Sequence, residues 1–400
     1  MSMFSKRFNK RACTGFLLLA AWLSASLPAP LFAQETPLDP NSSVKINIPG
    51  NSPVSLLSLN LGDSRATARG SAMVLDLHMT LSLRNTSGRR VRGVTLLLLA
   101  QEMTPFGKGS VAVPSLDVAP GEAFQMPIEV RLMRPLQSGA GPLVEVSLDG
   151  VLFQDLGFFG PDRLNSRRSM TFWETEAQRD RKYFKQVLQA RGLSGLQQEM
   201  LDSLARQAER PRLDVTVSRT GRATSAAASS PERVAQFAFL HMPDSPVSAT
   251  SGWAEISGNE VRSPRIQIVN QSSKPVRYVE IGWLVKDHQG REFLAGSVPA
   301  SDGELYLPPG QSGRLMQDTA LRFTRGAGQP NAGQHVQIQG MTGFVSQVEY
   351  SDGSVWVPRR ESLESSRLMR VMAPSPEEQK LSELYRTKGL TAVIEELKMF

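Results

Sequence analysis

Cysteine is almost absent from this sequence of 400 residues, which contains only Cys13. Cys13 precedes an apolar stretch, so it cannot be the acylated first residue of a mature lipoprotein. It also lies in a segment that we expect to be removed on export. The mature chain then has no disulfide, no thiolate metal site and no cysteine nucleophile. Its fold must be stabilised by the hydrophobic core alone.

The motifs of common catalytic and metal sites are also missing. The four histidines make no i, i+4 pair of the kind that binds zinc on a helix: His78, His241, His288 and His335. There is no Gly-x-Ser-x-Gly elbow, and the Ser-x-x-Lys at Ser42–Lys45 lies outside any expected helix. We therefore predict no catalytic residue, no metal site and no cofactor. An active site assembled from distant residues leaves no local motif, so a hydrolase remains an alternative.

Long apolar runs are confined to the N-terminus. A basic segment containing Lys6 and Arg11 is followed by the apolar stretch 16–27 and by a small residue, Ala33. This pattern predicts a bacterial signal peptide over residues 1–33 and a periplasmic or extracellular protein. The stretch is shorter than the roughly 20 residues that span a bilayer. We predict no transmembrane segment in the mature chain.

The charge of the mature chain is close to balanced. The sequence has 45 basic and 38 acidic residues, and four of the basic ones lie in the signal peptide. A nucleic-acid-binding protein normally shows a clustered basic stripe. We therefore expect no nucleic-acid partner.

One short sequence occurs twice. NTSGRRVRGV, at 85–94, returns as NQSSKPVRYV at 270–279, a spacing of 185 residues without a gap. Just before the first copy, Met73–Arg84 alternates apolar and polar residues, which predicts a half-buried strand. Leu81 and Leu83 correspond to Ile266 and Ile268. A slip of one residue would move all these side chains to the other face, so the repeat preserves a core in register.

The second copy resembles bacterial immunoglobulin-like domains of the FxLYD and CARDB kind. The resemblance rests on NQSSKPVRYVEIGWLVKDHQGREFLAG followed by LPPGQ, and it covers roughly Pro264–Gln311. It is weaker over Met73–Glu122, which lacks a hairpin like that at Asp287–Gly290. The resemblance implies an antiparallel β-sandwich in an exported protein that binds or spaces other molecules, and it implies no activity.

The apolar period becomes helical between the copies and again at the C-terminus, where Ser375-Pro-Glu-Glu378 is a capping box. We therefore predict a mostly β protein with helical inserts: two immunoglobulin-like antiparallel β-sandwiches, a helical linker and a C-terminal helical tail. The boundaries are a signal peptide (1–33), a disordered leader (34–43), sandwich 1 (44–161), a helical hairpin (162–211), sandwich 2 (212–360) and the tail (361–400).

One face near the end of the second sandwich is a candidate binding surface. If Asp352-Gly353 forms a two-residue hairpin, Trp356 lies on a polar face with Glu349 and Gln347. An exposed tryptophan there would bind a sugar or a peptide. The alternative is that the C-terminal helices cover it, because they need an apolar surface. We expect the linker helices to cover the outer face of the first sandwich.

The leading functional hypothesis is a non-enzymatic binding or scaffolding protein of the bacterial cell envelope, whose partner is another envelope or secreted protein. The first alternative is a carbohydrate- or peptide-binding module centred on the second sandwich at Trp356. The second alternative is a hydrolase whose site is not visible in the sequence.

Overall fold

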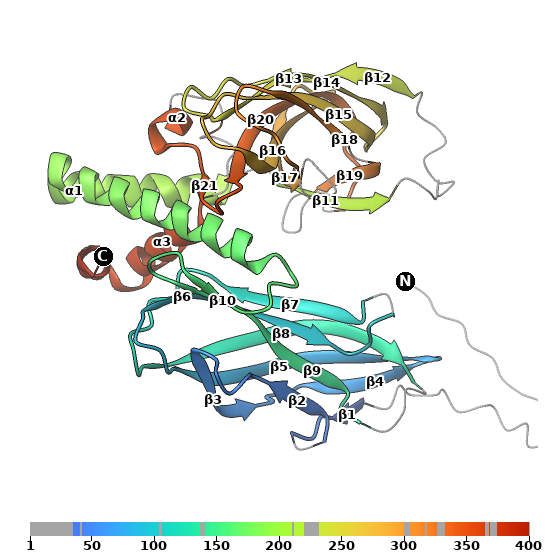
Figure 1. The fold of residues 1–400 in the computed structure, drawn as a ribbon, viewed down its shortest axis with the longest axis vertical. Coiled ribbons are helices and arrows are strands. Elements are labelled where there is room, and N and C mark those ends of the chain that lie inside the picture. The colour runs from blue at the N-terminus through green and yellow to red at the C-terminus, as the bar shows by residue number, and fades with distance from the viewer. Residues whose placement is uncertain are drawn as a thin grey trace, which may run out of the picture.

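The computed structural model describes most of the chain that follows the predicted signal peptide. The described residues are 35–40, 42–103, 106–136, 141–209, 212–219, 232–299, 305–316, 318–325, 333–364, 368 and 374–399. The predicted signal peptide, 1–33, lies outside them. The described chain is mostly β, with its helices gathered between two β-rich halves (Figure 1). No described helix has a stretch long and apolar enough to cross a membrane.

The first half contains two five-stranded sheets. One consists of β1 (Glu35–Pro37), β4 (Arg65–Arg69), β5 (Ala72–Asn85), β3 (Val54–Asn60) and β8 (Ala123–Pro135). The other consists of β10 (Phe158–Phe159), β9 (Val144–Phe153), β6 (Val91–Leu99), β7 (Lys108–Val113) and β2 (Val44–Asn47). Only β2 and β9 pair in parallel within this described half. Buried side chains from both sheets form one cluster, which includes Leu77, Leu96 and Val146.

The alternation in β5 is confirmed. Leu75, Leu77, Met79, Leu81 and Leu83 are buried on one face, and Val74 is the only apolar residue of β5 that is buried on the other. His78 and Arg84, on the opposite face, are exposed. Burying each large apolar side chain is worth roughly 1.5–3 kcal/mol, so this single strand contributes strongly to the core.

The predicted disorder of residues 34–43 is wrong for the part that the structure describes. Glu35–Pro37 forms β1, which pairs antiparallel with β4. Leu38 N then donates to Ser64 O at 3.2 Å. The edge of β4 offers backbone donors and acceptors, and a short segment with no marked apolar pattern can satisfy them.

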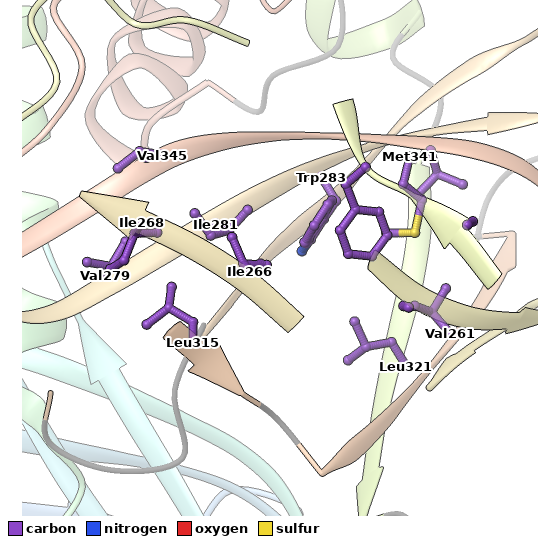
Figure 2. Close-up of a cluster of buried hydrophobic side chains, with 14 of the residues drawn as sticks. Val261, Ile266, Ile268, Val279, Ile281, Trp283, Leu315, Leu321, Met341 and Val345 are labelled. Atoms are coloured by element: carbon purple, nitrogen blue, oxygen red, sulfur yellow. The ribbon is translucent and has the colours of Figure 1, made fainter. Parts of the chain in front are cut away.

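The second half forms one hydrogen-bonded sheet of eleven strands: nine follow one another in a path, β18 pairs beside β15, and β21 pairs beside β20. Its strands are β11 (Arg212–Arg219), β12 (Arg233–Gln236), β13 (Ala238–Phe239), β14 (Val247–Ser257), β15 (Glu260–Asn270), β16 (Val276–Asp287), β17 (Glu292–Pro299), β18 (Ser312–Met316), β19 (Thr319–Arg325), β20 (Ile338–Tyr350) and β21 (Val355–Trp356). Figure 2 shows its core around Trp283. The Trp283 ring lies 4.6 Å from that of Phe237, centroid to centroid.

The repeated turn is built the same way in both halves. Asn85 Nδ2 donates to Arg89 O (2.8 Å) and Val118 O (3.1 Å), and Asn85 Oδ1 accepts from Ser87 N (3.0 Å). Asn85 is fully buried. A side chain that closes its own turn and also binds a neighbouring loop explains the choice of asparagine.

The second copy reproduces each of these bonds. Asn270 Nδ2 donates to Lys274 O and Leu307 O, both at 2.9 Å, and Asn270 Oδ1 accepts from Ser272 N, also at 2.9 Å. Asn270 is fully buried as well. The internal repeat therefore extends from the sequence to individual hydrogen bonds.

A long helix, α1 (Ser166–Glu209), crosses between the halves (Figure 1). The backbone at Gly192 is non-helical, with a φ of 67°, so α1 consists of two helices joined by a kink. α1 contacts β6 and β9 of the first half and β21 of the second. Its first part thus covers the first half, as expected, but it also faces the second.

The C-terminal helices pack on α1. They are α2 (Arg360–Glu364), α3 (Pro376–Lys388) and α4 (Leu390–Lys398). Ser375 accepts from Glu378 N at 3.1 Å, which confirms the predicted cap. A separate apolar cluster contains Phe184 and Met200 of α1 with Leu381 of α3 and Val393 and Leu397 of α4. The linker and the tail therefore form one helical layer.

Candidate functional site

Trp356 does not lie on the polar face. In the hairpin that precedes it, Tyr350 N donates to Ser354 O and Gly353 has a φ of 81°. The loop is thus one residue longer than the predicted two-residue turn, and the pairing shifts by one position. Trp356 pairs with Val348 and packs, partly buried, against the core. A one-residue shift exchanges the faces of a strand, so the prediction for Trp356 is wrong.

Glu349 and Gln347 lie at an internal junction rather than on a free surface. Both side chains are buried. Glu349 Oε2 accepts from Arg168 Nε of α1 at 2.6 Å, and Glu349 Oε1 pairs with Arg277. The Arg168 guanidinium also stacks over Tyr278, 3.9 Å from the ring centroid. α1 therefore covers the predicted ligand surface at Glu349.

The other side of α1 is fixed to the first half in a similar way. Glu174 of α1 is buried and accepts from Arg92 Nε at 3.2 Å. Arg92 also pairs with Asp117 at 2.8 Å. Asp149 of β9 accepts from the backbone amides of Arg163 and Leu164 just before α1 begins. Ion pairs to a buried carboxylate thus link α1 to both halves.

A further cluster of buried charges connects α1 to the C-terminal helices. Glu378 accepts from Arg360 Nη1 and from Ser203 Oγ, both at 2.6 Å. Asp180 accepts from Ser375 Oγ at 2.6 Å. Burial alone would raise the pKa of Glu378, but the bonds from Arg360 and Ser203 and the nearby Arg206 hold that pKa at about 2.

Glu176 behaves in the opposite way. Burial raises its pKa to about 7, and the nearby carboxylates of Asp180, Glu280 and Glu378 add to the effect. Arg179, with Nη2 at 3.7 Å from Glu176 Oε1, only partly offsets this. The junction therefore holds one carboxyl whose pKa is lowered and one whose pKa is raised to near neutrality.

Of the tryptophans that the structure describes, Trp253 alone is exposed, at 43%. It lies on β14 at the centre of a row of paired residues that crosses four strands. Gln236 of β12 pairs with Trp253, Trp253 with Arg265 of β15, and Arg265 with Met316 of β18. Directly paired residues project from the same face of a sheet. We call this surface the Trp253 face.

The Trp253 face is hollowed by about 350 Å³ between Ser251, Gly252, Trp253, Arg265, Ile266, Gln267, Arg314 and Met316. Arg265 pairs with Asp318 at 2.8 Å. Arg314 is exposed and has no ion-pair partner within the described residues. The face thus combines an indole ring and a thioether with guanidinium and amide groups.

Alternation could have located Trp253 in the sequence. In β14, Ala254 and Ile256 point into the core, whereas Trp253 and Glu255 point outward. The segment is short and is disturbed by shifts in register at two places. The same rule failed at Trp356 because the hairpin loop was assigned the wrong length.

The histidines remain apart. His78 is exposed, His335 Nδ1 lies 2.9 Å from Asn259 Nδ2, and His241 lines a small pocket of about 80 Å³ whose lining includes no carboxylate. Among the described residues, no group of three or more His, Cys, Asp or Glu side chains is arranged to hold a metal ion. These positions give the hydrolase hypothesis no additional support.

No family model and no curated protein matches this chain. A search of solved structures found the ApaA protein of Bordetella pertussis, at 14% identity over 38% of this chain and 91% of that one, with a TM-score of 0.16. A β-glucosidase from Kluyveromyces marxianus shows 8% identity over 69% of this chain and 45% of that one, with a TM-score of 0.13. A red sea bream transglutaminase shows 9% identity over 74% and 31%, with a TM-score of 0.12. Likenesses this weak carry no argument about fold or function.

Proposed function

We propose that this protein is an exported, non-enzymatic binding and scaffolding protein of the bacterial cell envelope. In this proposal two immunoglobulin-like β-sandwiches are held in a fixed orientation by α1, and the Trp253 face of the second binds an acidic surface of another envelope or secreted protein. The export part rests on the predicted signal peptide.

The matched turns support the idea of two related sandwiches. Asn85 and Asn270 make equivalent bonds to their own turns and to the loops at Val118 and Leu307. Each half also ends in a hairpin with the same backbone bonds, since Phe153 N donates to Gly157 O as Tyr350 N donates to Ser354 O. Two copies of one ancestral module explain these correspondences.

The observation that carries the binding proposal is the exposed Trp253 between Arg265 and Gln236. Tryptophan, methionine and arginine are enriched at the centres of protein interfaces, and tryptophan and arginine dominate the binding energy there. Met316 is 55% exposed and Arg314 is also exposed on this face. The guanidinium of Arg314, which has no ion-pair partner among the described residues, favours an acidic partner, because complementary charge speeds and orients association.

The test is a binding measurement with a partner captured by crosslinking from the native envelope and then purified. Trp253→Ala should weaken binding by about thirtyfold or more, which corresponds to a loss of about 2 kcal/mol at an interface centre. Arg314→Glu should slow association and reverse its dependence on salt. Tyr306→Ala is the matched control, because Tyr306 is 71% exposed and lies outside this face. A partner that binds Trp253→Ala normally would refute the proposal.

A second candidate is an oligosaccharide ligand on the same face. Gln236 pairs directly with Trp253, and Gln267 lies in the hollow, so amide groups surround a ring on which a sugar could stack. Titration with neutral oligosaccharides distinguishes the two candidates. A Trp253-dependent fluorescence change with maltohexaose or chitohexaose would favour the sugar.

A further inference from the structure

A second, larger pocket lies where α1 meets the first half. It has a volume of about 550 Å³ and is lined by Arg92, Gln154, Glu174, Gln178, Arg181, Lys182, Lys185, Gln186 and Gln189. Most small-molecule pockets are lined predominantly by apolar side chains. Every lining side chain here is polar, so the pocket is suited to a ligand that is rich in hydrogen-bonding groups.

The floor of this pocket is rigid and electrically balanced. Arg92, Glu174 and Arg181 have side chains that are at most 5% exposed. Glu174 bridges the two guanidinium groups, while Asp117 and Glu377 pair with their other sides, at 2.8 Å and 3.1 Å. The floor is therefore held in place by its own ion pairs and presents polar groups without a large excess of charge.

The excess charge lies on the rim. Lys182 and Lys185 line the pocket, and neither forms an ion pair with a described residue. Gln178, Gln186 and Gln189 come from successive turns of the same helix, and Gln154 comes from the β9–β10 turn opposite. Each amide offers two donor hydrogens and an acceptor oxygen, which matches hydroxyl groups.

We infer that this pocket binds an acidic saccharide of about two sugar units. Lys182 and Lys185 hold its carboxylate or phosphate group, and the glutamine amides bind its hydroxyl groups. A volume near 550 Å³ is far larger than a single small anion needs and lies within the usual range for small-molecule sites. The site lies in a different half from the Trp253 face and does not depend on the function proposed for that face.

Calorimetric titration of the full mature chain with three probes tests this inference. Digalacturonate carries the expected charge and hydroxyl groups, maltose carries the hydroxyl groups alone, and inorganic phosphate carries the charge alone. Digalacturonate should bind about tenfold or more tightly than either of the others, and its affinity should fall with added salt. Equal binding of maltose would overturn the role of charge, and equal binding of phosphate would overturn the saccharide.

The matched variants separate the pocket from general surface charge. Lys182→Gln with Lys185→Gln should weaken digalacturonate binding about tenfold or more. Gln186→Ala with Gln189→Ala should weaken it while leaving the weak binding of phosphate unchanged. Lys388→Gln is the control, because Lys388 is exposed near the end of α3 and does not line the pocket. Circular dichroism confirms that each variant folds, and unchanged affinity in the double lysine variant would refute the assignment.

Discussion

Arg92 and Arg277 occupy equivalent positions in the two copies of the repeat, and both connect their half to α1. Arg92 binds Glu174 of α1 directly, with Nε 3.2 Å from Oε2. Arg277 binds Glu349, whose other oxygen accepts from Arg168 of α1. The same position of the repeat thus connects each half to α1.

Removal of either arginine should destabilise the junction. Arg92→Ala leaves the buried negative charge of Glu174 with one positive partner fewer. Breaking such a buried pair generally lowers the free energy of unfolding by about 3–5 kcal/mol. Arg89→Ala is the control: Arg89 pairs with Asp155 on the surface, where pairs contribute about 0–1 kcal/mol. Chemical denaturation followed by circular dichroism measures both. Equal losses in the two variants would contradict the importance of the Arg92 pair.

Asn85→Ala and Asn270→Ala should destabilise their own halves to a similar extent. Each substitution removes two donated bonds and the bond from the serine amide. Each net hydrogen bond is worth about 1 kcal/mol, and carbonyls left unsatisfied add to the loss. We expect a loss of about 2–4 kcal/mol in each, measured by hydrogen exchange in the affected half. Asn47→Ala, at an exposed residue whose side chain bonds only to Glu145 among described residues, should change little.

Glu176 should make the protein less stable as the pH rises. Its pKa is about 7 in the folded chain and 4.5 as the ordinary value. The folded state therefore holds the proton more tightly, and this contribution is full below pH 4.5 and lost as the pH rises to about 7. The loss amounts to roughly 3 kcal/mol. Glu176→Gln should flatten the melting temperature across this range. An unchanged pH profile in that variant would show that Glu176 is ionised in the folded protein.

Glu378 should confer the opposite dependence at acid pH. Its pKa is lowered from 4.5 to about 2, so its stabilising effect is present above pH 4.5 and lost as the pH falls toward 2. Acid should release α3 and α4 from α1 before the β-rich halves unfold. Proteolysis at pH 3, with the fragments identified by mass spectrometry, checks this expectation. Glu383→Gln, an exposed substitution on α3, should release α3 and α4 at the same pH as the wild type. Glu378→Gln should expose these helices to protease even at pH 7.

The strongest sequence signals were local ones. The alternation over Met73–Arg84 located β5, and the Asn-x-Ser pattern located both repeated turns, because side-chain period and turn chemistry act over a few residues. The cap at Ser375 was found for the same reason.

The binding surfaces depended on information that no short segment contains. The position of Trp356 depended on a loop longer by one residue, and the environment of Glu349 depended on a helix more than 150 positions earlier in the chain. The pocket at Lys182 and Lys185 arises only where α1 meets Gln154 of the β9–β10 turn. Solvated helix charges and pocket-lining charges look alike until such neighbours are known.

The packing of α3 and α4 on α1 has a consequence for the chain during synthesis. Phe184 is completely covered in the finished protein, and Leu381, Val393 and Leu397 belong to the cluster that encloses it. These partners are synthesised about 200 residues after Phe184. The apolar face of α1 is therefore exposed to solvent during that part of synthesis. A holdase chaperone that covers the apolar face of α1 would protect the chain during this interval. A chain that ends before residue 381 should be the species most prone to aggregate.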